Sequence, residues 1–83
     1  MDFIVYILYS EKNKKYYIGS CQNIEERLNR HNTGRNKSTH SGMPWKLIYQ
    51  EHFDTRANAV TRENVIKKMK SKKYIEKIIS LTL

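Results

Sequence analysis

The feature that most constrains the fold is a run of seven apolar residues near the start of a chain that is otherwise polar and basic. Residues Phe3–Tyr9 read FIVYILY and carry no charge. An uninterrupted β-branched and aromatic run of this length is typical of a central strand buried on both faces. It is too short to cross a bilayer, which takes about 20 residues. The run therefore predicts the middle strand of a small sheet, and the 83 residues have room for a single domain, 1–83.

The segments that follow predict a hairpin and a capped helix. After a polar turn, Lys15–Ser20 alternates as a second strand, antiparallel to the first. Asn23 is a candidate N-cap, with Glu26 three residues later, and Gly34 is a candidate C-terminal stop. The sequence between these signals predicts a helix of about nine residues.

The second half of the chain predicts one more strand and two more helices. The third strand is expected over Trp45–Phe53, and Asp54 or Thr55 caps a helix that runs to about Lys70. Ser71 can cap a last helix with an apolar stripe. The order is ββαβαα, which predicts an α+β fold with a three-stranded antiparallel sheet flanked by helices.

Charge and cysteine usage narrow the class of function. The formal net charge is +8, which favours polyanionic partners, nucleic acid before anionic membrane. The single cysteine, Cys21, leaves no internal disulfide and no thiolate cluster for structural zinc. The start of the chain has no basic region or cleavage site of a secretory signal, so we expect a cytoplasmic protein without a membrane partner.

Two helices place charged side chains beside their apolar stripes. At 100° per residue, Glu63 falls in the stripe of Ala59 and Ile66, and a buried carboxylate is costly unless it is paired or binds a metal. A salt bridge and a metal site both remain open. Arg27 and His31 lie one turn apart, where guanidinium and imidazole can meet a phosphate. The alternative is an ordinary amphipathic helix whose arginine stem covers apolar surface.

The strands and loops add further candidates. Tyr6 and Tyr17 are accounted for by strand propensity and packing, whereas Gly19 inside a strand indicates a close approach to the backbone, or a bulge. Residues 34–44 form a basic loop, and lysines crowd the end of the chain. Backbone-phosphate contact is the preferred interpretation of these charges. The positions expected to bind nucleic acid are Gly19, Arg35, Lys37, Lys67 and Lys70.

Taken in order, these residues resemble the GIY-YIG nuclease superfamily, and in particular its small stand-alone bacterial members. Ile4-Val5-Tyr6 stands where the family has its first tripeptide, and Tyr17-Ile18-Gly19 matches the second. Arg27 and His31 match the family's Arg-x-x-x-His helix, and Glu63 matches its metal-binding glutamate. Position 20 departs from the pattern, since Ser20 stands where excision-repair members carry lysine.

The resemblance implies an endonuclease that cleaves phosphodiester bonds in DNA with a divalent metal, Mg²⁺ or another cation such as Mn²⁺, and it suggests a link to DNA repair. It implies that Tyr6 is the base or positioner of the attacking water, that Tyr17 and Arg27 hold the scissile phosphate, and that His31 assists. Glu63 is implied as the metal ligand. A tyrosine pKa near 10 is too high for a base at neutral pH, so arginine and metal are expected to lower it.

Two other functions compete with the endonuclease. One is a non-catalytic nucleic-acid-binding module on the same fold, and the other is an adaptor whose basic face docks an acidic protein. Branched, nicked and plain DNA are all open as substrates, as are RNA in place of DNA and a protein partner that supplies specificity. Tyr6, Tyr17, Arg27 and Glu63 together favour the enzyme, because binding alone needs no acidic residue facing phosphate.

Overall fold

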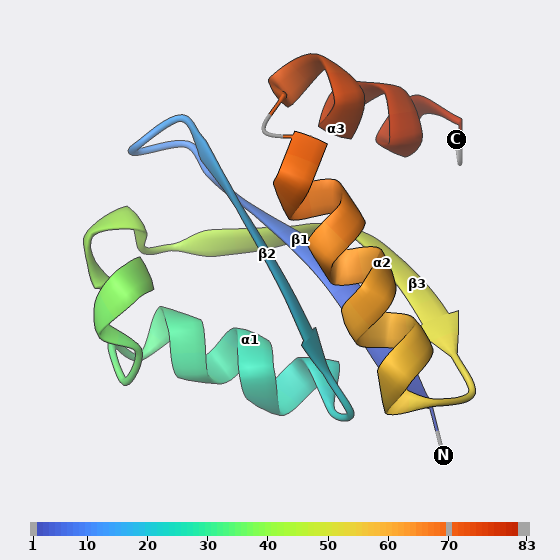
Figure 1. The fold of residues 1–83 in the computed structure, drawn as a ribbon. Helices are drawn as coiled ribbons and strands as arrows, with labels where there is room; N and C mark the ends of the chain where they lie inside the picture. Colours follow the sequence, from blue (N-terminus) through green and yellow to red (C-terminus); the bar gives the residue numbers. More distant parts are fainter. Residues whose placement is uncertain (1, 70, 82–83) are drawn as a thin grey trace.

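A three-stranded antiparallel sheet lies at the centre of the computed structural model, which describes residues 2–69 and 71–81 (Figure 1). Its strands are β1 (Phe3–Ser10), β2 (Lys15–Cys21) and β3 (Trp45–Phe53), in the order β2-β1-β3. The apolar run is thus the central strand, as predicted. Its pairing with β2 sets Tyr6 opposite Gly19.

Three α-helices and one short 3₁₀ helix complete the chain. They are α1 (Ile24–Asn32), η1 (Lys37–Gly42), α2 (Arg56–Met69) and α3 (Lys72–Ser80). The predicted order ββαβαα is confirmed, with η1 added inside the segment expected to be loop. Lys70, expected at the end of the second helix, lies outside the described residues.

The helices begin where side chains satisfy their first free backbone N–H groups. Asn23 accepts a hydrogen bond from the Glu26 amide at 3.0 Å, as the sequence predicts. Of the two candidate caps before α2, Thr55 is the one that accepts, from the amide of Asn58 at 3.1 Å. Gly34 follows the end of α1 with a φ of +79°, a backbone conformation that favours glycine.

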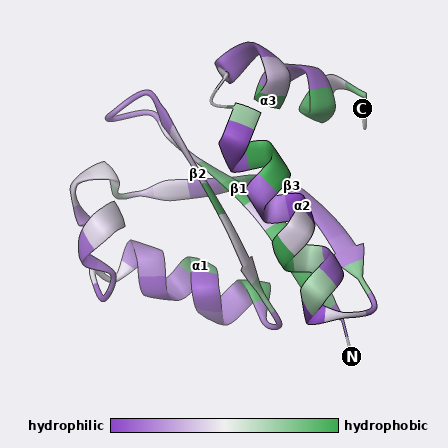
Figure 2. Cartoon of the chain, viewed as in Figure 1, coloured by the Kyte–Doolittle hydropathy of each residue, from purple (hydrophilic) through white to green (hydrophobic). Residues whose placement is uncertain are grey.

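The sheet is covered by helices on both faces, and β1 contributes buried side chains to both of them. Val5 and Ile7 pack with α2 and α3, against Ala59, Ile66, Ile75 and Ile78. Ile4, Tyr6 and Leu8 face the opposite side, with Cys21 and Trp45, against the inner side chains of α1. Figure 2 shows α1 as largely hydrophilic on the side displayed, whereas α2 alternates between hydrophobic and hydrophilic residues.

Asn32, the last residue of α1, fixes the start of β3. Its side-chain amide donates to the carbonyl of Trp45 at 3.0 Å, and its oxygen accepts from the Trp45 amide at 2.6 Å. The Trp45 indole donates to the carbonyl of Thr39 at 2.7 Å. The Asn32–Trp45 hydrogen bonds therefore join the two ends of the basic segment 33–44, and the Trp45 indole holds its middle at Thr39.

A polar network ties α3 to the rest of the molecule on the other face. The Arg62 guanidinium on α2 donates to both carboxylate oxygens of Glu51 on β3, at 3.0 and 3.2 Å, and to the hydroxyl of Tyr74 on α3 at 3.1 Å. Tyr49 donates to the same carboxylate. Burial and Glu51 raise the pKa of Tyr49 to about 12. In the described part of the chain, no helix is both long and apolar enough to cross a membrane.

Candidate active site

A line of buried hydrogen bonds runs from β1 through α1 into η1. The Tyr6 hydroxyl, at the centre of the sheet, lies 3.2 Å from Nε2 of His31. The other ring nitrogen of His31, Nδ1, lies 2.7 Å from the hydroxyl of Thr39. The exposed fractions are 1% for Tyr6, 0% for His31 and 1% for Thr39, so these hydrogen bonds form in a buried environment, where they are electrostatically stronger than in water.

The hydrogen bonds assign the protons along this line. The Thr39 hydroxyl has one proton and donates it to the carbonyl of Asn36 at 3.4 Å, so it accepts from His31 Nδ1–H. Nε2 of a neutral His31 is then an acceptor, and the Tyr6 O–H donates to it. Burial first, and then the charges of Arg27 and Arg30, lower the pKa of His31, which keeps the ring neutral.

The pKa of Tyr6 bears on its expected role as a base. Burial is the largest influence and raises this pKa well above its usual value, and Tyr17 raises it further. The Arg27 guanidinium lowers it through charge and a hydrogen bond, as expected, but does not outweigh burial. Tyr6 is therefore a neutral phenol whose proton has an acceptor in place, at His31.

Gly19 makes room for the Tyr6 hydroxyl. A Cβ at this position would lie 2.5 Å from Oη and 2.7 Å from Cζ of Tyr6. The close approach expected at Gly19 is thus made by a side chain of the neighbouring strand. Any larger residue at position 19 would push the phenol away from His31.

Tyr17 forms the partly exposed wall of the cluster. Its ring centroid lies 4.7 Å from that of His31 and 6.3 Å from that of Tyr6. Trp45 closes the group from the far side, with its centroid 6.3 Å from Tyr17. Tyr6, Tyr17 and His31, which come from three separate elements, are therefore gathered in one place.

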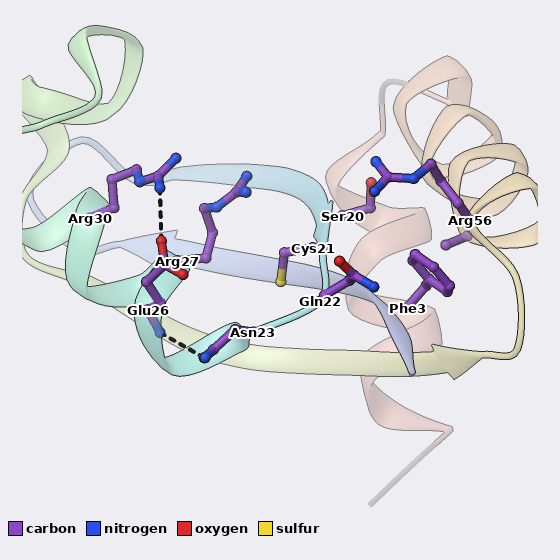
Figure 3. Close-up of a pocket in the computed structure, with 10 residues that line it drawn as sticks. Phe3, Ser20, Cys21, Gln22, Asn23, Glu26, Arg27, Arg30 and Arg56 are labelled. Atoms are coloured by element: carbon purple, nitrogen blue, oxygen red, sulfur yellow. Dashed lines mark hydrogen bonds and ion pairs between the residues drawn. The ribbon is translucent and has the colours of Figure 1, made fainter. Parts of the chain in front are cut away.

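Arg27 connects this cluster to a pocket of about 380 Å³ (Figure 3). On one side the guanidinium lowers the pKa of Tyr6, and on the other side it lines the pocket. The pocket lies at the Cys21 end of the edge strand β2, between α1 and the beginning of α2. Burial raises the pKa of the Cys21 thiol, which agrees with its expected role as a small apolar residue.

Glu63 lies on α2, which packs mainly on the face of the sheet opposite α1. It is one turn after Ala59, and Ala59 lines the same pocket as Arg27. Its side chain is 15% exposed, and its Oε2 accepts from Lys67 Nζ at 2.5 Å. The structure thus contains the salt bridge that the sequence left open. Among the described residues, no three His, Cys, Asp or Glu side chains gather as a metal cluster. A lone carboxylate fits a cation such as Mg²⁺, which keeps several waters and takes other ligands from phosphate.

The basic residues expected to bind nucleic acid are spread over the surface. Arg35 and Lys37 are exposed in and beside η1, and Lys67 is the partner of Glu63 on α2. Lys70 lies outside the described residues. Nucleic-acid contact by these positions stays a prediction.

Thr39 is the site residue that the sequence did not reveal. Its only signal is a hydroxyl inside the basic loop, eight positions after His31. Serine and threonine are common in polar loops, and nothing in the spacing indicates that this hydroxyl turns inward. Arg56, which lines the same pocket as Arg27, was missed because it lies on a different helix.

Comparison with known proteins identifies the class. A family model of the GIY-YIG catalytic domain matches residues 2–75. The chain therefore belongs to the GIY-YIG family, which supports a nuclease-type function.

Within that family the chain is similar to UPF0213 proteins. It is 38% identical over 68 residues to one from Staphylococcus saprophyticus, covering 81% of this chain and 83% of that protein. A UPF0213 protein of Clostridium perfringens is 36% identical over 80 residues, covering 95% of this chain and 85% of that protein. The solution NMR structure of a UPF0213 protein from Bacillus halodurans superposes with a TM-score of 0.62 at 27% identity, covering 98% of this chain and 85% of that one.

Proposed function

We propose that the protein is a divalent-metal-dependent endonuclease that hydrolyses phosphodiester bonds in DNA. The observation that supports this most is the buried line from Tyr6 through His31 to Thr39. A module that only binds nucleic acid has no use for a phenol whose proton is already directed at a neutral imidazole. Proton transfer by a positioned side chain is, in contrast, a common means of activating an attacking water.

Each residue of the cluster has a distinct part in this reaction. Tyr17 and Arg27 hold the scissile phosphate, because Tyr17 is partly exposed and Arg27 faces the pocket. The attacking water gives a proton to the Tyr6 oxygen while the Tyr6 proton passes to His31 Nε2. The water oxygen bonds to phosphorus, and the bond from phosphorus to one sugar oxygen breaks. The leaving oxygen takes a proton from solvent, and the extra proton on His31 returns through Tyr6 to solvent.

Substrate binding itself favours this proton transfer. The charge of Arg27 contributes to the lowered pKa of His31. A phosphate bound to the guanidinium offsets that charge and so raises the proton affinity of the imidazole. His31 thereby becomes a better acceptor only when substrate is in place.

Glu63 is the residue that would hold the cation, Mg²⁺ or Mn²⁺. When bound, such an ion stabilises negative charge on the phosphate and lowers the pKa of a bound water. The ammonium of Lys67 lies 2.5 Å from the same carboxylate, so a cation would compete with this ion pair for Glu63. The nucleic-acid contacts expected at Gly19, Arg35, Lys37 and Lys67, a protein partner that supplies specificity and a place in DNA repair belong to the same proposal.

The test is a cleavage assay on branched, nicked and plain DNA, with and without Mg²⁺, for the native protein and Glu63→Gln. Helical ion pairs between residues four positions apart contribute only about 0.3–0.5 kcal/mol, so the variant should keep its melting temperature or gain slightly. Its Mg²⁺-dependent cleavage should disappear. A variant that melts much lower and still cuts would rule out the metal-ligand role.

A second candidate is a non-catalytic nucleic-acid-binding module. The ion pair between Glu63 and Lys67 favours it, because it gives the carboxylate a structural partner. This function predicts salt-sensitive DNA binding without cleavage on any of the three substrates.

A further inference from the structure

The pocket beside Arg27 contains more positive charge than the proposed reaction uses. Its charged lining consists of Arg27, Arg30 and Arg56 and a single carboxylate, Glu26 (Figure 3). The arginines come from two helices, since the first two lie on α1 and Arg56 is the first residue of α2. In the sequence, η1 and β3 lie between these helices, and only the fold brings the side chains around one cavity.

The single carboxylate does not balance this charge. Glu26 Oε1 accepts from the Arg30 guanidinium at 2.8 Å, so these two residues neutralise each other. Within residues 2–69 and 71–81, no carboxylate forms an ion pair with Arg27 or Arg56. Two uncompensated guanidinium groups therefore face the same pocket, an arrangement suited to an anion.

The position of Arg56 is defined although the residue is exposed. Its guanidinium carbon lies 5.5 Å from the centroid of the Phe3 ring, a cation–π contact that holds the side chain across the first residue of β1. Ser20 lines the same pocket, and Figure 3 draws its side chain together with that of Arg56. A planar guanidinium held in this way can present two parallel N–H donors to a phosphate.

We infer that this pocket binds a second backbone phosphate of the DNA strand, next to the phosphate held by Tyr17 and Arg27. The inference rests on the proposed function, because Arg27 lies between the tyrosine cluster and the pocket and would contact both phosphates. A strand following this path runs past the end of β2, from the cluster towards Arg56. Arg56 then positions the substrate and takes no part in the chemistry.

The experiment compares Arg56→Gln with Lys12→Gln. Both variants lose one positive charge, but Lys12 lies in the β1–β2 turn, at the opposite end of β2 from the pocket. Binding to a short duplex is measured without metal over a range of salt concentrations. The slope of log K against log salt is negative, and each lost phosphate contact should reduce its magnitude by about 0.9. We expect this reduction for Arg56→Gln, no reduction for Lys12→Gln, and recovery of the native slope in Arg56→Lys.

A titration with inorganic phosphate, followed through the backbone amides of Cys21 and Asn23 by NMR, separates a strand site from a free-anion site. If Arg56→Gln weakens phosphate binding but matches Lys12→Gln on duplex DNA, the pocket takes a small anion and the inference is wrong. Equal salt slopes for the two glutamine variants overturn it as well. If the native protein cuts no DNA and the Arg56→Gln slope still falls, the inference stands and the catalytic proposal fails. In an active enzyme, Arg56→Gln should raise KM and leave kcat unchanged.

Discussion

The two faces of the sheet are built from alternate residues of the same strand, yet they differ in kind. The face covered by α2 and α3 is an apolar core, in which Val5, Ile7 and Ile66 are each at most 1% exposed. The face covered by α1 is equally buried but carries Tyr6, His31 and Thr39, joined by hydrogen bonds. One face stabilises the fold through apolar burial. On the other face, buried hydrogen bonds hold polar groups in a fixed geometry.

This difference explains how a chain of 83 residues can maintain a buried polar cluster. A domain of this size has little apolar surface to bury, and each polar group placed in the core must be hydrogen-bonded or it destabilises the fold. Among the described residues, no buried side-chain nitrogen or oxygen lacks a hydrogen-bond partner. Substitutions on the two faces should therefore separate activity from stability.

The largest expected effect is on activity, at the α1 face. Tyr6→Phe removes the hydroxyl that donates to His31 and should reduce cleavage about 10²- to 10⁴-fold, the usual contribution of a positioned proton-transfer group. The ring remains, so the protein should stay folded. Tyr9→Phe is the matched control, because the Tyr9 ring packs at a tilt against Tyr16 near the hairpin turn, away from the cluster. Equal loss in both variants would contradict the role of Tyr6.

The second effect is on stability, at the other face. Ile66→Ala removes a fully buried side chain between α2 and the sheet and should cost about 2–5 kcal/mol of unfolding free energy. Below its melting temperature the variant should still cut. Denaturant unfolding measures the loss, and Val60→Ala, at a position 38% exposed on the same helix, is the control. If Ile66→Ala abolished cleavage while folded, the two faces would not be separable.

The third effect links geometry to stability within the α1 face. Thr39→Val keeps the shape but leaves the buried Nδ1–H of His31 without an acceptor, which should cost about 1–3 kcal/mol. Cleavage should fall too, because the tautomer that accepts from Tyr6 is no longer fixed. Thr39→Ser retains the hydroxyl and should restore both properties. Unfolding curves and cleavage rates of the two variants, measured together, decide this point.

The smallest effect concerns pH. The pKa of His31 is lowered by folding, so below about pH 6.5 the unfolded chain binds more protons than the folded one. The melting temperature should therefore decrease as pH falls from about 6.5 towards the lowered pKa, and His31→Gln should flatten this part of the curve. The exposed His40 provides the control as His40→Gln. A native curve that rises on acidification would contradict the assignment of a neutral, buried His31.

Local signals were enough to predict the strands and the α-helices, but contacts between distant residues could not be predicted. The apolar run and the Asn23 cap each act within a few residues, and each is found where expected. The Tyr6–His31 bond spans 25 positions, and the spacing of residues alone does not predict such a contact. For Glu63, the helical wheel indicated burial but could not choose between a cation and Lys67.

The two hydrogen bonds between Asn32 and Trp45 make the segment between them an exchangeable module. They close the loop whatever its sequence, and doubling the length of a flexible loop costs only about 0.6 kcal/mol. Insertions after Gly34 should therefore be accommodated without unfolding the sheet. Because Thr39 in this segment also touches His31, the same insertions would alter the chemistry. Relatives with a longer loop could thus have new substrate preferences, provided that a hydroxyl in the loop still accepts the hydrogen bond from Nδ1 of the imidazole.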